Sequence, residues 1–186
     1  MQADRREKFY EDAIRDLACS QPGDVDCSSL ELALNLAFTY HEQNSFFAKY
    51  MSQFGLAKST FNVLMLLRNG PAEGMQLSEI GSLLITSRAN ITGLIDHLEQ
   101  KGYVRRIADV NDRRAKLARI TRRGETLIDE VLPVHVRRCH DLFAHLTNEE
   151  KEILNNLLKR VRQSPALTQA SELPEGELVS ATMNED

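Results

Sequence analysis

Two short helical segments joined by a tight turn, with a basic segment directly after them, constrain the fold of this chain most strongly. The first segment covers residues 78–84, and we expect Ser78 to cap its N-terminus. The second starts at Thr86 or Ser87 and ends at Gly102. Its apolar residues recur at helical spacing and are Ile91, Leu94, Ile95 and Leu98. Two such helices, the second amphipathic with a polar start, are the pattern of a helix-turn-helix.

The basic segment that follows has the pattern of a β-hairpin. Residues 103–107 and 115–120 are short and alternate in polarity, as strands do, and they flank the polar connector 109–114. We therefore predict a wing attached to the helix-turn-helix, and with it a mainly α fold with a small β-wing.

Positive charge is concentrated around this predicted wing. Nine basic and two acidic residues lie between residues 101 and 123, in a chain whose formal net charge is −4. A local excess of this size on a mildly acidic protein favours a polyanionic partner, above all nucleic acid. The alternative is a solvent-exposed loop whose arginines pair with acidic residues elsewhere on the surface.

The rest of the chain is also predicted to be mostly helical. A capping box at Ser28 to Glu31 opens a helix that Gly55 ends, and it carries six of the chain's 11 aromatic residues. A shorter helix begins at Lys58 or Ser59. The remaining predictions are a long helix from Thr121 to about Leu146, kinked at Pro133, and a last helix opened by a second capping box at 147–150.

Composition excludes several classes of protein. No stretch approaches the roughly 18 uncharged apolar residues of a membrane span, and the start of the chain has no apolar secretory segment. Three cysteines, Cys19, Cys27 and Cys139, are too few for a disulfide scaffold, so we expect a reducing, cytoplasmic environment. The chain has no Gly-x-Ser-x-Gly, His-Glu-x-x-His or phosphate-cradling glycine motif, and we predict neither an enzyme nor a cofactor.

Three local patterns resemble the MarR-type winged helix-turn-helix regulators of bacteria and archaea. These patterns are Leu77 to Ile80, Leu94 to Val104 and Asp112 to Gly124, and the resemblance covers roughly residues 29–163. It implies a homodimer that binds a pseudo-palindromic DNA operator, most often as a repressor, and that a small aromatic or other effector releases. It also implies a winged helix-turn-helix domain joined to a helical dimerisation platform.

The resemblance and the charge distribution together predict the domain organisation. The parts are an N-terminal extension (1–28), a helical dimerisation region (29–55 and 122–163), a winged helix-turn-helix domain (56–121) and an acidic C-terminal tail (164–186).

Side chains on the second helix of the motif and on the wing are the candidate DNA contacts. The helix candidates are Ser87, Arg88, Asn90 and Thr92, and the wing candidates are Arg113, Arg114 and Lys116. Arginine suits guanine in the major groove or a narrow minor groove, and asparagine suits adenine. By the resemblance, Asp112 is structural at the wing tip, and Arg114 is the strongest single candidate. The alternative is that these residues cap the helix or remain solvated.

An effector pocket is the second candidate site. The resemblance points to residues Tyr40, His41, Asn44, Phe47 and Arg68, although an aromatic stripe at helical spacing also suits a plain dimer core. Three other interpretations stay open. The protein could sense an oxidant through Cys19 or Cys27, it could bind a metal at His135 and Cys139, or it could be a protein-interaction module on this fold that has lost DNA binding.

Overall fold

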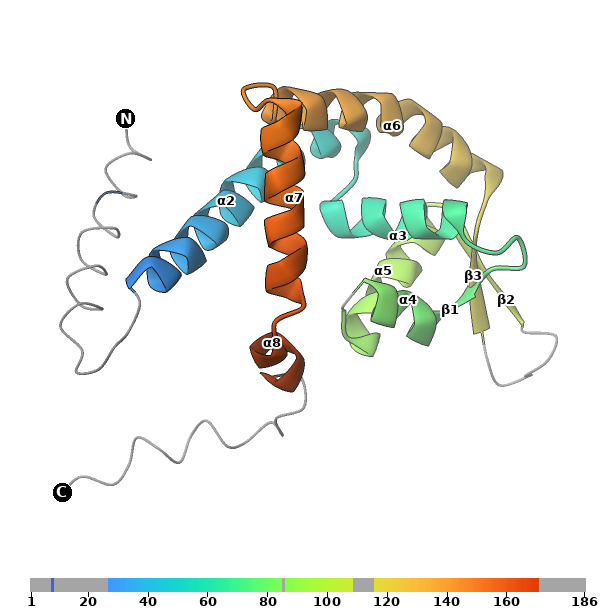
Figure 1. Cartoon of the computed structure of the whole chain (residues 1–186). Coiled ribbons are helices and arrows are strands. Elements are labelled where there is room, and N and C mark those ends of the chain that lie inside the picture. Colours follow the sequence, from blue (N-terminus) through green and yellow to red (C-terminus); the bar gives the residue numbers. More distant parts are fainter. Residues whose placement is uncertain (1–7, 9–26, 85, 109–115, 171–186) are drawn as a thin grey trace, which may run out of the picture. The chain divides into compact units, whose positions relative to one another are not determined.

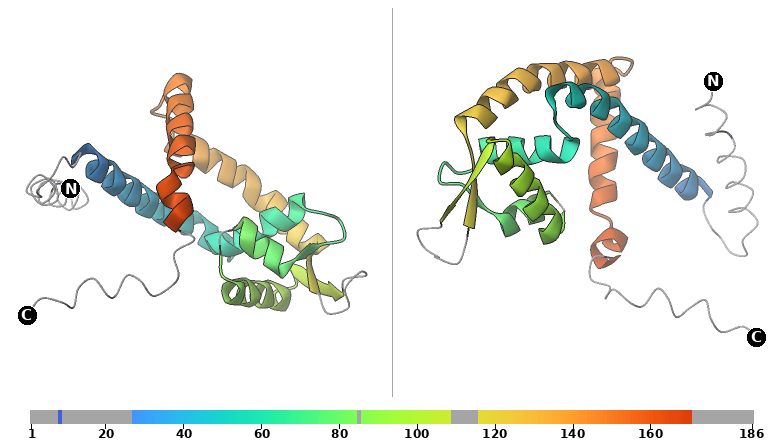
Figure 2. Two further views of the ribbon diagram at one scale, coloured as in Figure 1. Left: turned by 60° about the horizontal axis from the view of Figure 1, so that its bottom comes forward. Right: turned by 180° about the vertical axis from the view of Figure 1, so that it is seen from behind.

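The computed structural model describes residues 8, 27–84, 86–108 and 116–170, and Figures 1 and 2 show them from three sides. The chain divides into two compact units, residues 1–135 and 136–186, which we describe separately. None of the described helices combines the length and the apolar character that a membrane span requires.

Helices dominate both units. The first unit contains α2 (Cys27–Met51), η1 (Ser52–Phe54), α3 (Lys58–Asn69), β1 (Met75–Gln76), α4 (Leu77–Leu83), α5 (Arg88–Gln100), β2 (Val104–Ala108), β3 (Lys116–Ile120) and most of α6 (Arg122–Leu142). The second unit contains the end of α6, α7 (Asn148–Arg162) and α8 (Pro165–Ala170). The prediction of a mainly α fold with a small β-wing is therefore confirmed.

The sheet has three antiparallel strands in the order β1-β3-β2. The predicted hairpin is present as β2 and β3, in a register that places Val104 opposite Ile120. Strand β1 was not predicted. It is only two residues long, with Met75 paired to Ala118, and two residues are too few for an alternating pattern to be recognised in a sequence.

The core of the first unit forms where α5 packs against its neighbours. Ile91, Ile95 and Leu98 are completely buried, as the predicted apolar stripe requires. Ile80 of α4 and Leu64 of α3 are also completely buried. Burial of one full face of α5 fixes the direction of its opposite face, which is exposed to solvent.

The predicted helix ends are partly right. Ser87 is the N-cap of α5, and Thr147 forms the predicted capping box with Glu150 at the start of α7. The Ser78 prediction is wrong: β1 runs directly into α4, so the extended Gln76 occupies the N-cap position without a side-chain bond. Ser28 is not a cap either, because α2 already includes Cys27.

The long predicted helix is confirmed as α6, but it ends at Leu142, about four residues earlier than expected. Pro133 lies inside it.

The junction between the hairpin and α6 is tightly packed. Thr121 Oγ1 donates a hydrogen bond to the Gly102 carbonyl oxygen (2.7 Å) and accepts one from the Gly124 backbone N–H (3.2 Å). A Cβ atom placed on Gly124 would lie 2.4 Å from the Tyr103 carbonyl oxygen and 2.8 Å from Ile120 Cγ1. The first turn of α6 can therefore approach β3 this closely only with a glycine at position 124.

Alanine substitutions at two helical glycines should have opposite effects on stability. Gly124→Ala should lower the free energy of unfolding by about 1–3 kcal/mol, since the methyl group meets backbone atoms that cannot move away freely. Gly93→Ala, on the exposed side of α5 where a Cβ meets nothing within 4 Å, should raise it by about 0.5–1 kcal/mol. Urea unfolding monitored by circular dichroism measures both values. Equal effects of the two substitutions would contradict the packing described for Gly124.

Candidate nucleic-acid interface

The start of α5 presents polar residues to solvent. The Ser87 hydroxyl accepts a hydrogen bond from the Asn90 backbone N–H (3.4 Å) and so helps to begin the helix. Ser87, Asn90 and Thr92 are exposed, whereas Ile91 between them is completely buried. Arg88 is the first residue of α5. Ser87, Asn90 and Thr92 are therefore exposed in the first turns of one helix, which Arg88 begins.

The wing candidates are only partly described. Lys116 is exposed at the start of β3. Arg113, Arg114 and Asp112 lie outside the described residues, so their roles stay predictions from the sequence.

Arg106 on β2 connects the wing to α5. Its Nη1 atom lies 2.6 Å from a carboxylate oxygen of Asp96 and 2.6 Å from one of Glu99. Its backbone N–H also donates to the second oxygen of Glu99 (2.7 Å), so Glu99 holds both the main chain and the side chain of Arg106. These bonds fix the position of β2 against α5. Asn90 lies on the opposite side of that helix.

The pKa of the Glu99 carboxyl is lowered by this arrangement. The hydrogen bond from the Arg106 backbone N–H is the main cause, and the guanidinium adds to it, while partial burial acts in the opposite direction. Glu99 therefore stays ionised over a wider pH range than an ordinary glutamate.

Several of the basic residues around the wing have structural partners. Arg106 is paired with Asp96 and Glu99. Lys101 Nζ donates to the Gly55 carbonyl oxygen (3.1 Å), and the Arg123 guanidinium lies over the ring of Tyr103, 5.1 Å from its centroid. The concentration of nine basic residues predicted a polyanionic partner, with arginines paired to acidic residues as the alternative. For these three residues the positive charge has partners within the domain, so part of the charge stabilises the fold.

The five predicted effector residues fall into separate environments. Tyr40 is exposed, with Lys58 Nζ 4.9 Å from its ring centroid, and Asn44 Oδ1 accepts a hydrogen bond from the same Nζ (2.5 Å). His41, in the same helix, is exposed. Phe47 is buried instead in an aromatic group with Phe46, Tyr50 and His135, and Arg68 pairs with Asp129 of α6 (2.5 Å). The predicted single pocket is therefore not formed by the described part of this one chain.

His135 has an aromatic environment, with its ring centroid 4.8 Å from that of Phe61 and 5.3 Å from that of Phe47. Its Nδ1 atom forms a hydrogen bond with the Tyr50 hydroxyl. Burial lowers the pKa of His135, which favours the neutral imidazole. Among the described residues, no group of three or more His, Cys, Asp or Glu side chains is arranged to hold a metal ion.

Comparisons with known proteins place these features in a family. The model of the MarR family matches residues 56–116. The HTH-type transcriptional regulator MhqR of Bacillus subtilis (strain 168) is 33% identical over 133 residues, which cover 72% of this chain and 90% of that protein. The HTH-type transcriptional repressor YetL of the same organism is 28% identical over 134 residues, covering 72% of this chain and 80% of that protein.

Solved structures show the same fold. Sco3205, a MarR family transcriptional regulator from Streptomyces coelicolor whose crystal structure is a complex with DNA, matches with a TM-score of 0.71 at 18% identity. The match covers 77% of this chain and 91% of that one. The prediction of a winged helix-turn-helix fold is therefore confirmed.

The contact between Arg106 and Glu99 should contribute measurably to stability. In a double-mutant cycle, Glu99→Gln and Arg106→Gln should show a coupling energy of about 0.5–1 kcal/mol, because both carboxylates that face Arg106 are partly solvated and screened. Glu79→Gln, on the exposed side of α4, is the control for loss of a carboxylate.

The same contact should depend on pH. Because the folded state lowers the pKa of Glu99, its contribution is complete above the unfolded-state pKa and is lost as the pH falls through the folded-state pKa. The acid loss of stability should therefore be smaller in Glu99→Gln than in the wild type. Identical acid profiles for the two proteins would contradict the role given to Glu99.

Proposed function

The chain belongs to the MarR family, and on that basis we propose that it is a transcriptional repressor that binds a pseudo-palindromic DNA operator as a homodimer. Members of this family regulate transcription by binding DNA and are not enzymes. We further propose that it works in the cytoplasm, where a bacterial or archaeal operator is accessible.

The observation that carries this proposal is the division of α5 into two faces. Its apolar face is completely buried at Ile91, Ile95 and Leu98, so the exposed face is held rigidly by the domain core. Asn90 and Thr92 are exposed on either side of the buried Ile91 and have the chemistry for base edges in a major groove, and Arg88 begins the same helix. We propose that α5 is the recognition helix, and that Ser87 combines capping with a phosphate contact.

We propose that the wing contacts DNA beside the groove that α5 enters. The contact between Arg106 and the carboxylates of Asp96 and Glu99 fixes the base of the hairpin against α5. Positive charge at Arg113, Arg114 and Lys116 favours phosphates or a narrow minor groove. Arg114 is the main wing contact in this proposal, with Asp112 shaping the wing tip.

The apolar surface of α7 supports the homodimer. Helix α7 has no buried residue, although it carries a row of apolar side chains on one side. Ile153 is 59% exposed, Leu157 48%, Leu154 40% and Val161 39%. A second copy of the chain presents the same row, and a two-fold axis allows the two rows to cover each other. In the first unit, α2 also carries exposed leucines, Leu30 and Leu32, which a second copy of the chain could cover.

We also propose that a small organic ligand releases the protein from DNA. Of the predicted effector residues, Tyr40 and Asn44 lie together around the Lys58 ammonium, which suits the acid group of an aromatic ligand.

Selection of DNA from a random duplex pool, followed by fluorescence anisotropy on the enriched sequence, tests the DNA proposal. Asn90→Ala should weaken specific binding by about 5- to 150-fold, the value of one good contact to a base edge. Arg114→Ala should weaken binding to all sequences and reduce the salt dependence by about one phosphate contact. Gln100→Ala, exposed at the far end of α5, is the matched control and should bind like the wild type.

A folded wild-type protein that enriches no sequence would contradict the repressor proposal. If a sequence is enriched but Asn90→Ala binds it as tightly as Gln100→Ala does, α5 is not the recognition helix.

Disruption of the apolar row on α7 tests the homodimer. Leu157→Asp should sediment as a monomer at concentrations where the wild type is a dimer, because a carboxylate buried in an apolar interface costs several kcal/mol. Asn155→Asp adds the same charge to the same helix away from the apolar row and should leave the mass unchanged. A wild type that sediments at the monomer mass of 21.1 kDa would contradict the proposal.

A further inference from the structure

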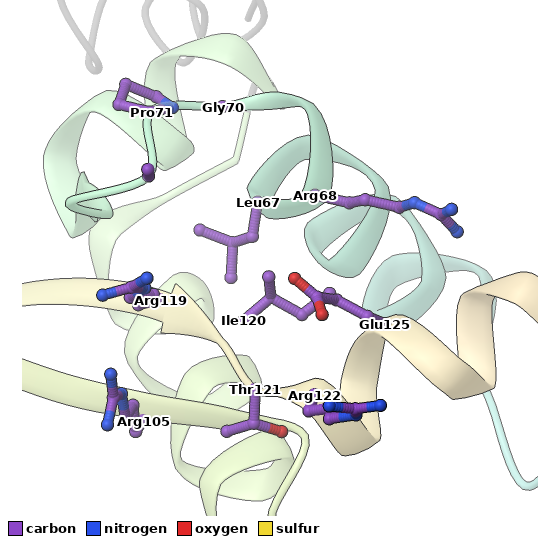
Figure 3. A pocket seen from close by; sticks show the side chains of 11 residues that line it. Leu67, Arg68, Gly70, Pro71, Arg105, Arg119, Ile120, Thr121, Arg122 and Glu125 are labelled. Carbon is purple, nitrogen blue, oxygen red and sulfur yellow. The ribbon is translucent and has the colours of Figure 1, made fainter.

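A cavity of about 440 Å³ opens beside the base of the wing, within the first unit (Figure 3). It lies between the end of α3 with the loop that follows, the strands β2 and β3, and the first turn of α6. Its lining residues are Leu67, Arg68, Gly70, Pro71, Ala72, Arg105, Arg119, Ile120, Thr121, Arg122 and Glu125. The volume falls in the range of small-molecule sites.

Two arginines of the lining are direct neighbours across the hairpin. Arg105 on β2 is paired in register with Arg119 on β3, and Figure 3 shows both at the same side of the cavity. Like charges at opposite positions of two antiparallel strands destabilise a sheet. The repulsion between Arg105 and Arg119 therefore destabilises the hairpin, and a bound anion would remove this repulsion.

Arg122 adds a third positive charge to the lining, from the start of α6, and its guanidinium points away from Leu67 and Ile120 in Figure 3. Among the residues that the structure describes, Arg105, Arg119 and Arg122 form no ion pair, whereas Arg68 at the rim is already paired with Asp129. Glu125 is the one carboxylate of the lining. Three unpaired guanidinium groups around one acid give a site that favours anions.

The two hairpin arginines of this cavity are on the side of the hairpin that faces away from α5. Arg106 reaches Asp96 and Glu99 of α5, so its side chain lies on the α5 side of the sheet. Side chains alternate along a strand, which places Arg105, and Arg119 opposite it, on the other side. The charge in this cavity is thus separate from the face of α5 that we propose reads DNA.

An apolar surface separates the two groups of charge. Leu67 and Ile120 lie between the Arg105–Arg119 pair and the first turn of α6 in Figure 3. Leu67 is only 4% exposed and Ile120 is half-buried, so both are fixed by the domain core. A ligand that fills this space needs an apolar body as well as acidic groups.

We propose that this cavity binds a small organic dianion, either a dicarboxylate or a phosphate monoester with an apolar body. One acidic group lies between Arg105 and Arg119, where two guanidinium forks can each donate paired hydrogen bonds to it. The apolar body covers Leu67 and Ile120, and the second negative charge extends past them toward Arg122 at the edge of the cavity. Such a ligand joins β2 and β3 to α6, and its effect on DNA affinity, though not its binding, rests on the proposed function.

Isothermal titration calorimetry of the full chain without DNA tests the site. The probes are phthalate, phenyl phosphate and the monoanion benzoate at about pH 8, where a phosphate monoester is doubly ionised. We expect at least one dianion to bind about tenfold more tightly than benzoate, and the tighter of the two identifies the ligand class. Arg119→Gln should weaken dianion binding about tenfold, the value of a charged hydrogen-bond pair that is partly solvated.

Arg137→Gln, an exposed arginine elsewhere on α6, is the matched control and should bind the dianion like the wild type. Arg119→Gln without ligand should unfold at the same or a higher temperature than the wild type, because it relieves the repulsion with Arg105. Dianions that bind no better than benzoate, or an equal loss in Arg137→Gln, would overturn the proposal. A weaker affinity of Arg119→Gln for duplex DNA, without dianion binding to the wild type, would identify these arginines as a DNA-backbone contact instead.

Discussion

The hydrogen-bonded ion pairs of Arg106 with Asp96 and Glu99 determine how the two parts of the winged domain work together. A β-hairpin of two five-residue strands is marginal on its own, and most of its stability comes from what it packs against. Here one guanidinium and one backbone N–H join β2 to α5. The orientation of the hairpin therefore depends on the helix, and a change at one is transmitted to the other.

The arginines of the hairpin have different roles because strands alternate. Arg106 faces α5 and is neutralised, whereas its neighbour Arg105 faces the opposite side beside Arg119, in a cavity with an apolar floor. Charge that is adjacent in the sequence is thus divided between a structural contact and a candidate ligand site. The net charge of the segment predicts neither role. The two roles differ only in the side of the strand to which each arginine points.

The sequence predicted those features that local periodicity and capping determine. The apolar stripe of α5, the Ser87 cap, the hairpin and the Thr147–Glu150 capping box were all predictable, since each depends on residues a few positions apart. Strand β1 and the Gln76 cap were not, because both exist only through pairing with β3, about 40 residues later. The ion pairs of Arg106 and the cross-strand pairing of Arg105 with Arg119 could not be predicted either. Both depend on the strand register, which a hairpin pattern in the sequence does not determine. Four of the predicted effector residues lie at helical spacing in α2, yet Phe47 is part of the core, and Arg68 of α3 pairs with Asp129 of α6.

Gly93 has a further consequence for how a protein of this kind changes over generations. It lies in α5 on the exposed side, and a Cβ atom added there would meet nothing within 4 Å. Core positions such as Ile91 and Ile95 are completely buried and constrained by their packing, whereas a Cβ atom fits at position 93 without a clash. Under the proposed function, position 93 is therefore a place where the DNA-facing surface of α5 can change while the core that holds the helix stays the same.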